Sequence, residues 1–175
     1  MVVFIPLLGM FFSCENTVAE IEQLNIDSIY PSQSIKDVEI QYSEKGKVAL
    51  QLNAPVLHQY EGKLPYEEMP EGVHVKIFDS LMNVTSELTA NYAIKLTHSD
   101  RMEAKYDVVV INEKGEKLNT EHLVWDKESG EITSDVFVKI TTLDQVIMGD
   151  GLISNQDFSD YRILKPRGVI NIDND

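Results

Sequence analysis

From residue 35 onward, apolar and polar residues alternate along most of the chain, and this is the feature that most restricts its fold. Val38, Ile40 and Tyr42, for example, are separated by single polar residues. A period of two places the apolar side chains on one face of a β-strand, whereas a helix needs a period of about 3.6. The alternation recurs in segments 48–52, 73–77, 84–92, 106–110, 118–124, 132–140 and 146–153. No stretch of a dozen residues shows a helical period, so the sequence predicts an all-β fold.

A short pattern repeats within these strands. In each copy an aliphatic residue is followed two positions later by a small residue and five positions later by an apolar one; the copies are 52–57, 88–93, 118–123 and 147–152. The small residues are Ala54, Ala90, Thr120 and Gly149, and the last three lie about 30 residues apart. Such a spacing predicts stacked two-strand units that form a rolled or sandwiched sheet. Small residues at one register suit a bend in the sheet or a close approach of two backbones.

The longest interval between copies contains segment 61–72, which is rich in Glu, Pro and Gly and is expected to be a loop. The densest glycine cluster is Gly149-Asp150-Gly151. Its neighbours are strand-like and no helix follows, so we expect a bulge or tight bend there and not a phosphate-binding loop.

Charge excludes one class of partner. The chain has 175 residues, enough for a single domain, and its net charge is −14 from 29 acidic and 15 basic residues. Proteins that bind nucleic acid need a basic surface, so nucleic acid is not an expected partner. Docking on anionic lipid by charge is excluded for the same reason, and any attachment to a membrane needs an anchor.

The N-terminus supplies a candidate anchor at Cys14, the one cysteine of the chain. Residues 1–13 are apolar and uncharged and end in Ser13, which resembles a bacterial lipoprotein signal followed by its lipidated cysteine. The run is too short to span a bilayer, which takes about 20 residues. Two features depart from such signals: no basic residue precedes the run, and Phe11 stands where Leu is usual. The alternative is a buried strand or helix with an ordinary core cysteine.

Four segments follow from these patterns: a signal with the lipidation site (1–14), a polar tether (15–34), a β-domain (35–170) and an acidic tail (171–175). A short helix around 18–24 within the tether is an additional expectation.

Residues that would indicate catalysis are scattered. His58, His74, His98 and His122 do not have metal-ligand spacing, and the chain lacks the motifs of serine nucleophiles and phosphate loops. Trp125 follows a strand and is expected to be a core or rim aromatic. We therefore predict no enzyme activity, no metal and no cofactor.

The segments GEKLNTEHLVWD (115–126) and VIMGDGL (146–152), with others in the same order, resemble the LptC family of lipopolysaccharide-export proteins. The most specific part is the ordered run 115–152: segment 115–126 (GEKLNTEHLVWD) is similar to a strand-turn element of that family, 131–138 to the next element, and 146–152 to a following strand with a G-x-G pattern. Segment 88–93 (LTANYA) resembles another of its strands, and 65–72 resembles an insert of Bacteroidetes-type members. The resemblance covers roughly residues 35–170.

The resemblance implies a twisted β-jellyroll whose apolar interior holds the acyl chains of lipopolysaccharide, while a partner supplies the energy by ATP hydrolysis. The candidate groove residues are the apolar members of the alternating strands: Val108, Val110, Leu118, Leu123, Val136, Val138, Ile140, Ile147 and Leu152.

It also implies that the two sheet edges pair with neighbouring components by strand addition. The edge at 35–42, with Val38, Ile40 and Tyr42, would face the jellyroll subunits of an inner-membrane ABC transporter. The C-terminal edge would pair with a periplasmic bridge protein; it is expected in segments 147–153 and 161–170 and to include Ile147, Gly149, Gly151 and Ile153. The expected location is the periplasm, anchored through lipidated Cys14, with the inner membrane favoured. Many family members have an N-terminal transmembrane helix instead, which leaves the choice of membrane open.

The main alternative is an envelope lipoprotein with a β-sandwich that binds carbohydrate or protein. It would use exposed aromatic side chains, for which Trp125, Tyr60 and Tyr66 are the candidates, although their spacing does not form a set.

Overall fold

The computed structural model of the chain describes residues 30–44, 46–99 and 101–171, and these residues form eleven strands and no helix. The strands are β1 (Gln33–Glu44), β2 (Lys47–Tyr60), β3 (Tyr66–Met69), β4 (Val73–Phe78), β5 (Val84–Ala90), β6 (Tyr92–Leu96), β7 (Arg101–Asn112), β8 (Lys117–Asp126), β9 (Glu131–Thr141), β10 (Gln145–Asn155) and β11 (Tyr161–Asn171). The prediction of an all-β fold is confirmed. Among these residues, no helix has the length and apolar character needed to cross a membrane.

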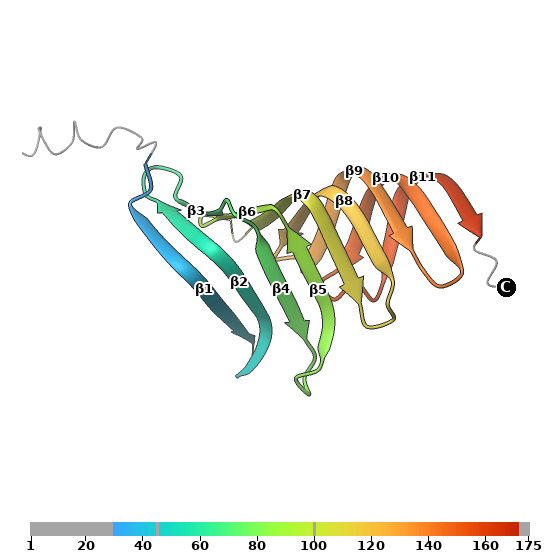
Figure 1. Cartoon of the computed structure of the whole chain (residues 1–175), viewed down its shortest axis with the longest axis horizontal. Helices are drawn as coiled ribbons and strands as arrows, with labels where there is room; N and C mark the ends of the chain where they lie inside the picture. The colour runs from blue at the N-terminus through green and yellow to red at the C-terminus, as the bar shows by residue number, and fades with distance from the viewer. Residues whose placement is uncertain (1–29, 45, 100, 172–175) are drawn as a thin grey trace, which may run out of the picture.

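All strands belong to one antiparallel sheet, which runs from β1 at one end to β11 at the other (Figure 1). Consecutive strands β7 to β11 pair with one another, and β1 pairs along its length with β2. Within the described residues, β1 and β11 are the strands with a neighbour on one side only.

Most long strands bend near their middle, and the sheet folds over into two halves with the core between them. The register shifts between Lys105 and Val108 in β7, between Thr120 and Val124 in β8, and next to Gly151 in β10. Half A consists of segments 38–44, 47–54, 73–78, 84–90, 108–112, 117–120, 136–141, 145–149 and 166–171. Half B consists of segments 33–36, 56–60, 66–69, 92–96, 101–105, 122–126, 131–134, 152–155 and 161–165.

The repeated pattern marks this bend. Its first positions lie in half A and share one register row across the sheet: Leu52, Val75, Leu88, Val110, Leu118, Ile140 and Ile147 are successive partners. Its small residues are buried at the bend, and its last positions, Leu57, Ala93, Leu123 and Leu152, are buried in half B. Strict alternation would place the next buried residue two positions after the small residue, but in the repeat it follows three positions later. The one additional residue is what a β-bulge inserts. The expected bulge at Gly149–Gly151 is confirmed by register shifts on both sides of β10.

Between β2 and β7 the sheet is divided into two separate strand pairs. The first half of β2 pairs with β4 and its second half with β3, while β7 pairs with β5 and β6. The pair β4–β5 therefore belongs to half A and the pair β3–β6 to half B. The two pairs meet at the crease near Gly72, where a Cβ atom would lie 2.8 Å from the carbonyl oxygen of Ala90.

Two expectations are corrected by this topology. Segment 61–72 is not simply a loop, because residues 66–69 form β3, whose four residues are too few to show an alternation. Strand β10 is not an edge: it pairs with both β9 and β11, so Ile147, Gly149, Gly151 and Ile153 lie one strand inside the boundary. Cys14, the segment 18–24 and residues 172–175 lie outside the described residues.

Candidate functional site

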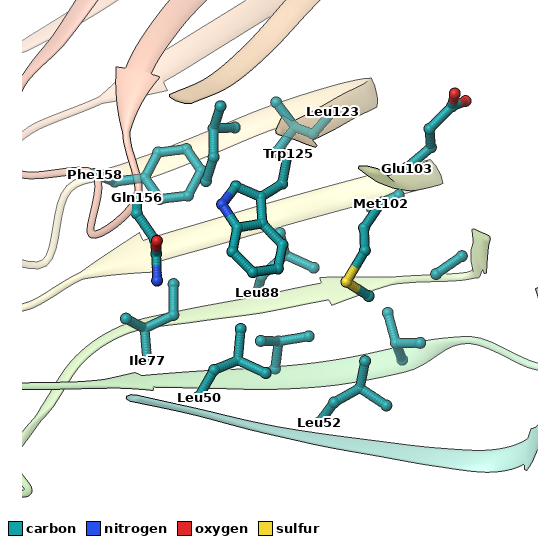
Figure 2. A pocket seen from close by; sticks show the side chains of 15 residues that line it. Leu50, Leu52, Ile77, Leu88, Met102, Glu103, Leu123, Trp125, Gln156 and Phe158 are labelled. Atoms are coloured by element: carbon teal, nitrogen blue, oxygen red, sulfur yellow. The ribbon is translucent and has the colours of Figure 1, made fainter. Parts of the chain in front are cut away.

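An apolar pocket lies between half A and half B, next to the strand pairs into which the sheet divides. Its unfilled part measures about 70 Å³, within a wider space of about 620 Å³ that includes its opening to solvent. Half A contributes Leu50, Leu52, Val73, Val75, Ile77 and Leu88, and half B contributes Ala93, Met102, Ala104, Leu123, Trp125 and Ile132. Figure 2 shows the side chains of Leu50, Leu52 and Ile77 facing those of Trp125 and Met102 across this space.

A second pocket continues the first toward β1. It has an unfilled volume of about 160 Å³ and shares Leu50, Leu52, Met102 and Trp125 with the first. Together the two pockets form one apolar groove, which we call the inner groove, from Tyr42 to the loop between β10 and β11. A cavity of about 150 Å³ holds a molecule of the size of benzene. The inner groove therefore has room for part of an apolar chain as it stands.

Charged side chains lie at the β1 end of the inner groove. Lys95 forms a salt bridge of 3.1 Å with Glu67, and both line the groove. Lys127 lies above the ring of Tyr42, 4.7 Å from its centroid, in a cation–π contact between the turn after β8 and strand β1. This end is thus polar at its rim and apolar inside, an arrangement suited to an amphipathic ligand.

The loop between β10 and β11 closes the other end. Phe158 is buried, with a positive φ of 55°, and it lines both the inner groove and a smaller pocket beyond it. Ser86 Oγ of β5 donates a hydrogen bond of 2.6 Å to the carbonyl of Asp157, and Asn112 Nδ2 of β7 donates one of 3.2 Å to the carbonyl of Phe158. The loop starts and ends in half B, so these bonds tie it across the opening to half A.

Trp125 places an unpaired polar atom inside the inner groove. It is the only tryptophan of the chain, and its Nε1 atom is buried without a hydrogen-bond partner. Figure 2 shows this nitrogen on the side of the ring that faces Gln156 and Phe158.

The sequence matches the family described as lipopolysaccharide-assembly, LptC-related, over residues 1–169. The chain belongs to this family. A comparison with curated proteins gives no match. Membership of the LptC family gives the chain a role in lipopolysaccharide transport, with an envelope location and with lipopolysaccharide and other transport components as partners.

The structure places the nine predicted groove residues in four environments. Leu123 lines the inner groove, and Val110, Leu118, Ile140 and Leu152 line the smaller pocket behind Phe158. Val108 and Val138 are completely buried and line neither pocket. Val136 and Ile147 are half-buried. Contact of any of these residues with lipid stays a prediction.

Most of the inner groove was missed by sequence reasoning. The alternation identifies Leu50, Leu52, Val73 and Val75 as strand residues, but their strands are distant in sequence from β8, which faces them. Trp125 had been considered a core or rim aromatic, and its unpaired nitrogen follows from tertiary packing alone. The repeat did contain a signal for the inner groove. Its first positions lie in half A and its last positions in half B, and these two halves are the walls of the groove.

The outer face of half B carries a tyrosine cluster that brings together Tyr60 and Tyr66, although their spacing in the sequence predicts no set. Tyr60 and Tyr66 stack with ring centroids 4.5 Å apart, and Tyr92 lies edge-on to Tyr106 at 6.0 Å. The hydroxyl of Tyr92 donates a hydrogen bond of 2.8 Å to Glu68. The pKa of Tyr92 lies well above its ordinary value. Burial is the larger cause, and the hydrogen bond to Glu68 is the next. Trp125 lies on the opposite face and does not join this cluster.

Among the described residues, no three His, Cys, Asp or Glu side chains gather as a metal site would require. Two histidines are instead paired with carboxylates, His74 with Glu87 at 2.8 Å and His122 with Glu103 at 3.2 Å.

Proposed function

We propose that the inner groove carries acyl chains of lipopolysaccharide through the periplasm, receiving them from an inner-membrane ABC transporter and passing them to the next jellyroll protein. The observation that supports this most directly is the apolar groove between half A and half B, with a polar rim at one end. No catalytic step is needed, because the protein provides only a dry path.

Burial of acyl chain is favourable by about 0.8 kcal/mol for each CH₂ group, which is sufficient to keep a lipid out of water. The volumes of about 70 and 160 Å³ hold only part of such a chain. To take more of it, the two halves must move apart. The bend at Ala54, Ala90, Thr120 and Gly149 lies along the line about which they would open.

The two edge strands suit the proposed chain of jellyrolls. β1 and β11 each leave one side without a partner in the described sheet, and an exposed edge can accept a strand from another chain. We assign β1, with Val38, Ile40 and Tyr42, to the transporter side. The onward side is β11, which takes the place expected for 147–153. Lipidation of Cys14 would hold the domain at the inner membrane.

Site-specific photo-crosslinking in cells that make lipopolysaccharide tests this proposal. A photoreactive amino acid at Met102, which lines both parts of the inner groove, is expected to capture lipopolysaccharide. Ile111 is the matched control, because it lies on the same strand, is 45% exposed and lines none of the groove pockets. Capture of protein or sugar without lipid at Met102, or equal lipid capture at both positions, would contradict the proposal.

A second candidate is supported by the tyrosine cluster. Stacked aromatic rings beside a carboxylate are a common surface for carbohydrate or protein ligands. Under this alternative, a photoreactive group at Tyr66 captures the ligand and one at Met102 captures nothing.

A further inference from the structure

The indole nitrogen of Trp125 is a buried hydrogen-bond donor without an acceptor. Buried donors in native proteins nearly always have a partner, because an unpaired donor has lost its hydrogen bond to water without a replacement. The side chain lines both parts of the inner groove, so this donor belongs to the groove and not to the closed core.

Little else in the groove could accept the hydrogen. The nearest polar side chain in Figure 2 is that of Gln156, at the end closed by Phe158. Glu103 also lines the groove, but its carboxylate is bound at 2.9 Å to Lys105 and at 3.2 Å to His122. A water molecule bonded to Trp125 and Gln156 would have only two polar partners, the lower limit of the two to four that hold water in a protein interior.

We propose that the inner groove prefers acyl chains that carry a hydroxyl group, with the hydroxyl oxygen accepting a hydrogen bond from Trp125 Nε1. The proposal rests on the function proposed above and specifies its ligand. A hydroxyl is both acceptor and donor, so the same group can donate its hydrogen to the amide oxygen of Gln156. A plain methylene group satisfies neither side chain.

The size of the preference follows from the hydrogen bond. One net hydrogen bond is equivalent to a change in affinity of roughly fivefold to tenfold. We therefore expect 3-hydroxytetradecanoic acid to bind the full chain roughly fivefold to tenfold more tightly than tetradecanoic acid. Both probes have the same length and the same carboxylate, so their ratio isolates the hydroxyl.

Isothermal titration calorimetry with the two acids is the test. In Trp125→Phe the ring remains and the donor is lost, so the ratio should fall to about one while tetradecanoic acid still binds. Tyr106→Phe is the matched control: it removes a donor from an exposed aromatic side chain outside the groove and should keep the wild-type ratio.

Because Trp125 is the only tryptophan, a tryptophan analogue with sulfur in place of the indole N–H can be placed there alone. This variant keeps the ring shape if Trp125→Phe does not fold, and it should also bind the two acids equally. A preference that persists without the N–H, or equal binding of both acids to the wild type, overturns the hydroxyl preference alone. Failure of the wild type to bind either acid overturns both this proposal and the lipid-carrying function.

Discussion

Gly149 lies close to the backbone of β11, beside Lys165 and Pro166. A Cβ atom at this position would meet the side chain of Ile163 and would lie 2.6 Å from the carbonyl oxygen of Lys165. Backbone cannot move aside as the end of a flexible side chain can, so the small residue of the last repeat is required by the bend itself.

We predict that Gly149→Ala lowers the free energy of unfolding by about 2–3 kcal/mol, as overpacking does in a close-packed interior. Gly115→Ala is the control, because its Cβ would meet nothing and only its positive φ of 76° would be strained, at about 1 kcal/mol. Urea denaturation of both variants measures the difference. An equal loss in the two would show that the close approach at the bend is not tight.

Glu103 makes stability depend on pH. Burial raises its pKa, but hydrogen bonds from Lys105 and His122 outweigh this effect and hold the pKa below its ordinary value. A carboxyl whose pKa is lower in the folded state stabilises the protein above its unfolded-state pKa. This contribution disappears as the pH falls through the folded-state pKa.

We therefore expect the difference in unfolding free energy between wild type and Glu103→Gln to be largest above about pH 4.5 and to shrink at lower pH. Chemical denaturation from pH 7 to pH 3 provides the measurement. Glu113→Gln, which alters an exposed carboxylate, should show a much smaller pH-dependent difference. If the difference in unfolding free energy between wild type and Glu103→Gln stays constant over this range, the contacts of Glu103 with Lys105 and His122 do not make stability depend on pH.

At the scale of elements, the loop between β10 and β11 is bonded to half A by two side chains. Its ties to Ser86 and Asn112 join parts of the chain 71 and 46 residues apart. Phe158, held with a left-handed backbone by these ties, separates the inner groove from the smaller pocket. Any ligand that continues toward β11 must pass this side chain.

Ser86→Ala should loosen this loop, because the Asp157 carbonyl loses the hydroxyl that donates to it. We expect faster hydrogen exchange of the amides in 155–160, with the exchange in β4 and β5 unchanged. Ser129→Ala, which removes a hydroxyl bonded to Asp126 and Glu131 around the turn after β8, serves as the control and should leave the amides in 155–160 unaffected. Exchange at wild-type rates in Ser86→Ala would mean that the loop is held by Phe158 packing instead.

The elements that sequence reasoning identified are those whose pattern is local. Alternation and the Leu-x-small spacing located the long strands and their bend, since period and bulge are both properties of consecutive residues. Strands β3 and β6 are short and depend on each other and on β2 and β7, so their pairing is visible only in the folded chain. The tyrosine cluster and the wall formed by Trp125 could not be predicted for the same reason, because both depend on contacts between strands that are distant in sequence.

At the scale of the whole molecule, the sheet formed by the described residues has two open edges, and the chain is strongly acidic with a net charge of −14. Exposed edges invite pairing between copies, and like charge opposes it. On β11 the second half is further protected by Pro166, which has no N–H to donate, and by the register shift beside it. The segment Tyr161–Lys165 is therefore the part of β11 best able to accept a strand.

We predict that copies of the chain associate as the pH approaches the isoelectric point near 4.6, because loss of charge removes the repulsion while the edges remain. Light scattering coupled to size-exclusion chromatography at pH 7 and pH 5 measures the mass. Leu164→Lys places a charge on the exposed face of Tyr161–Lys165 and should reduce the association, whereas Leu143→Lys, in the turn after β9, should not. If both variants associate like the wild type, the contact does not use β11, and the onward strand addition that we assign to this edge would lose its physical basis.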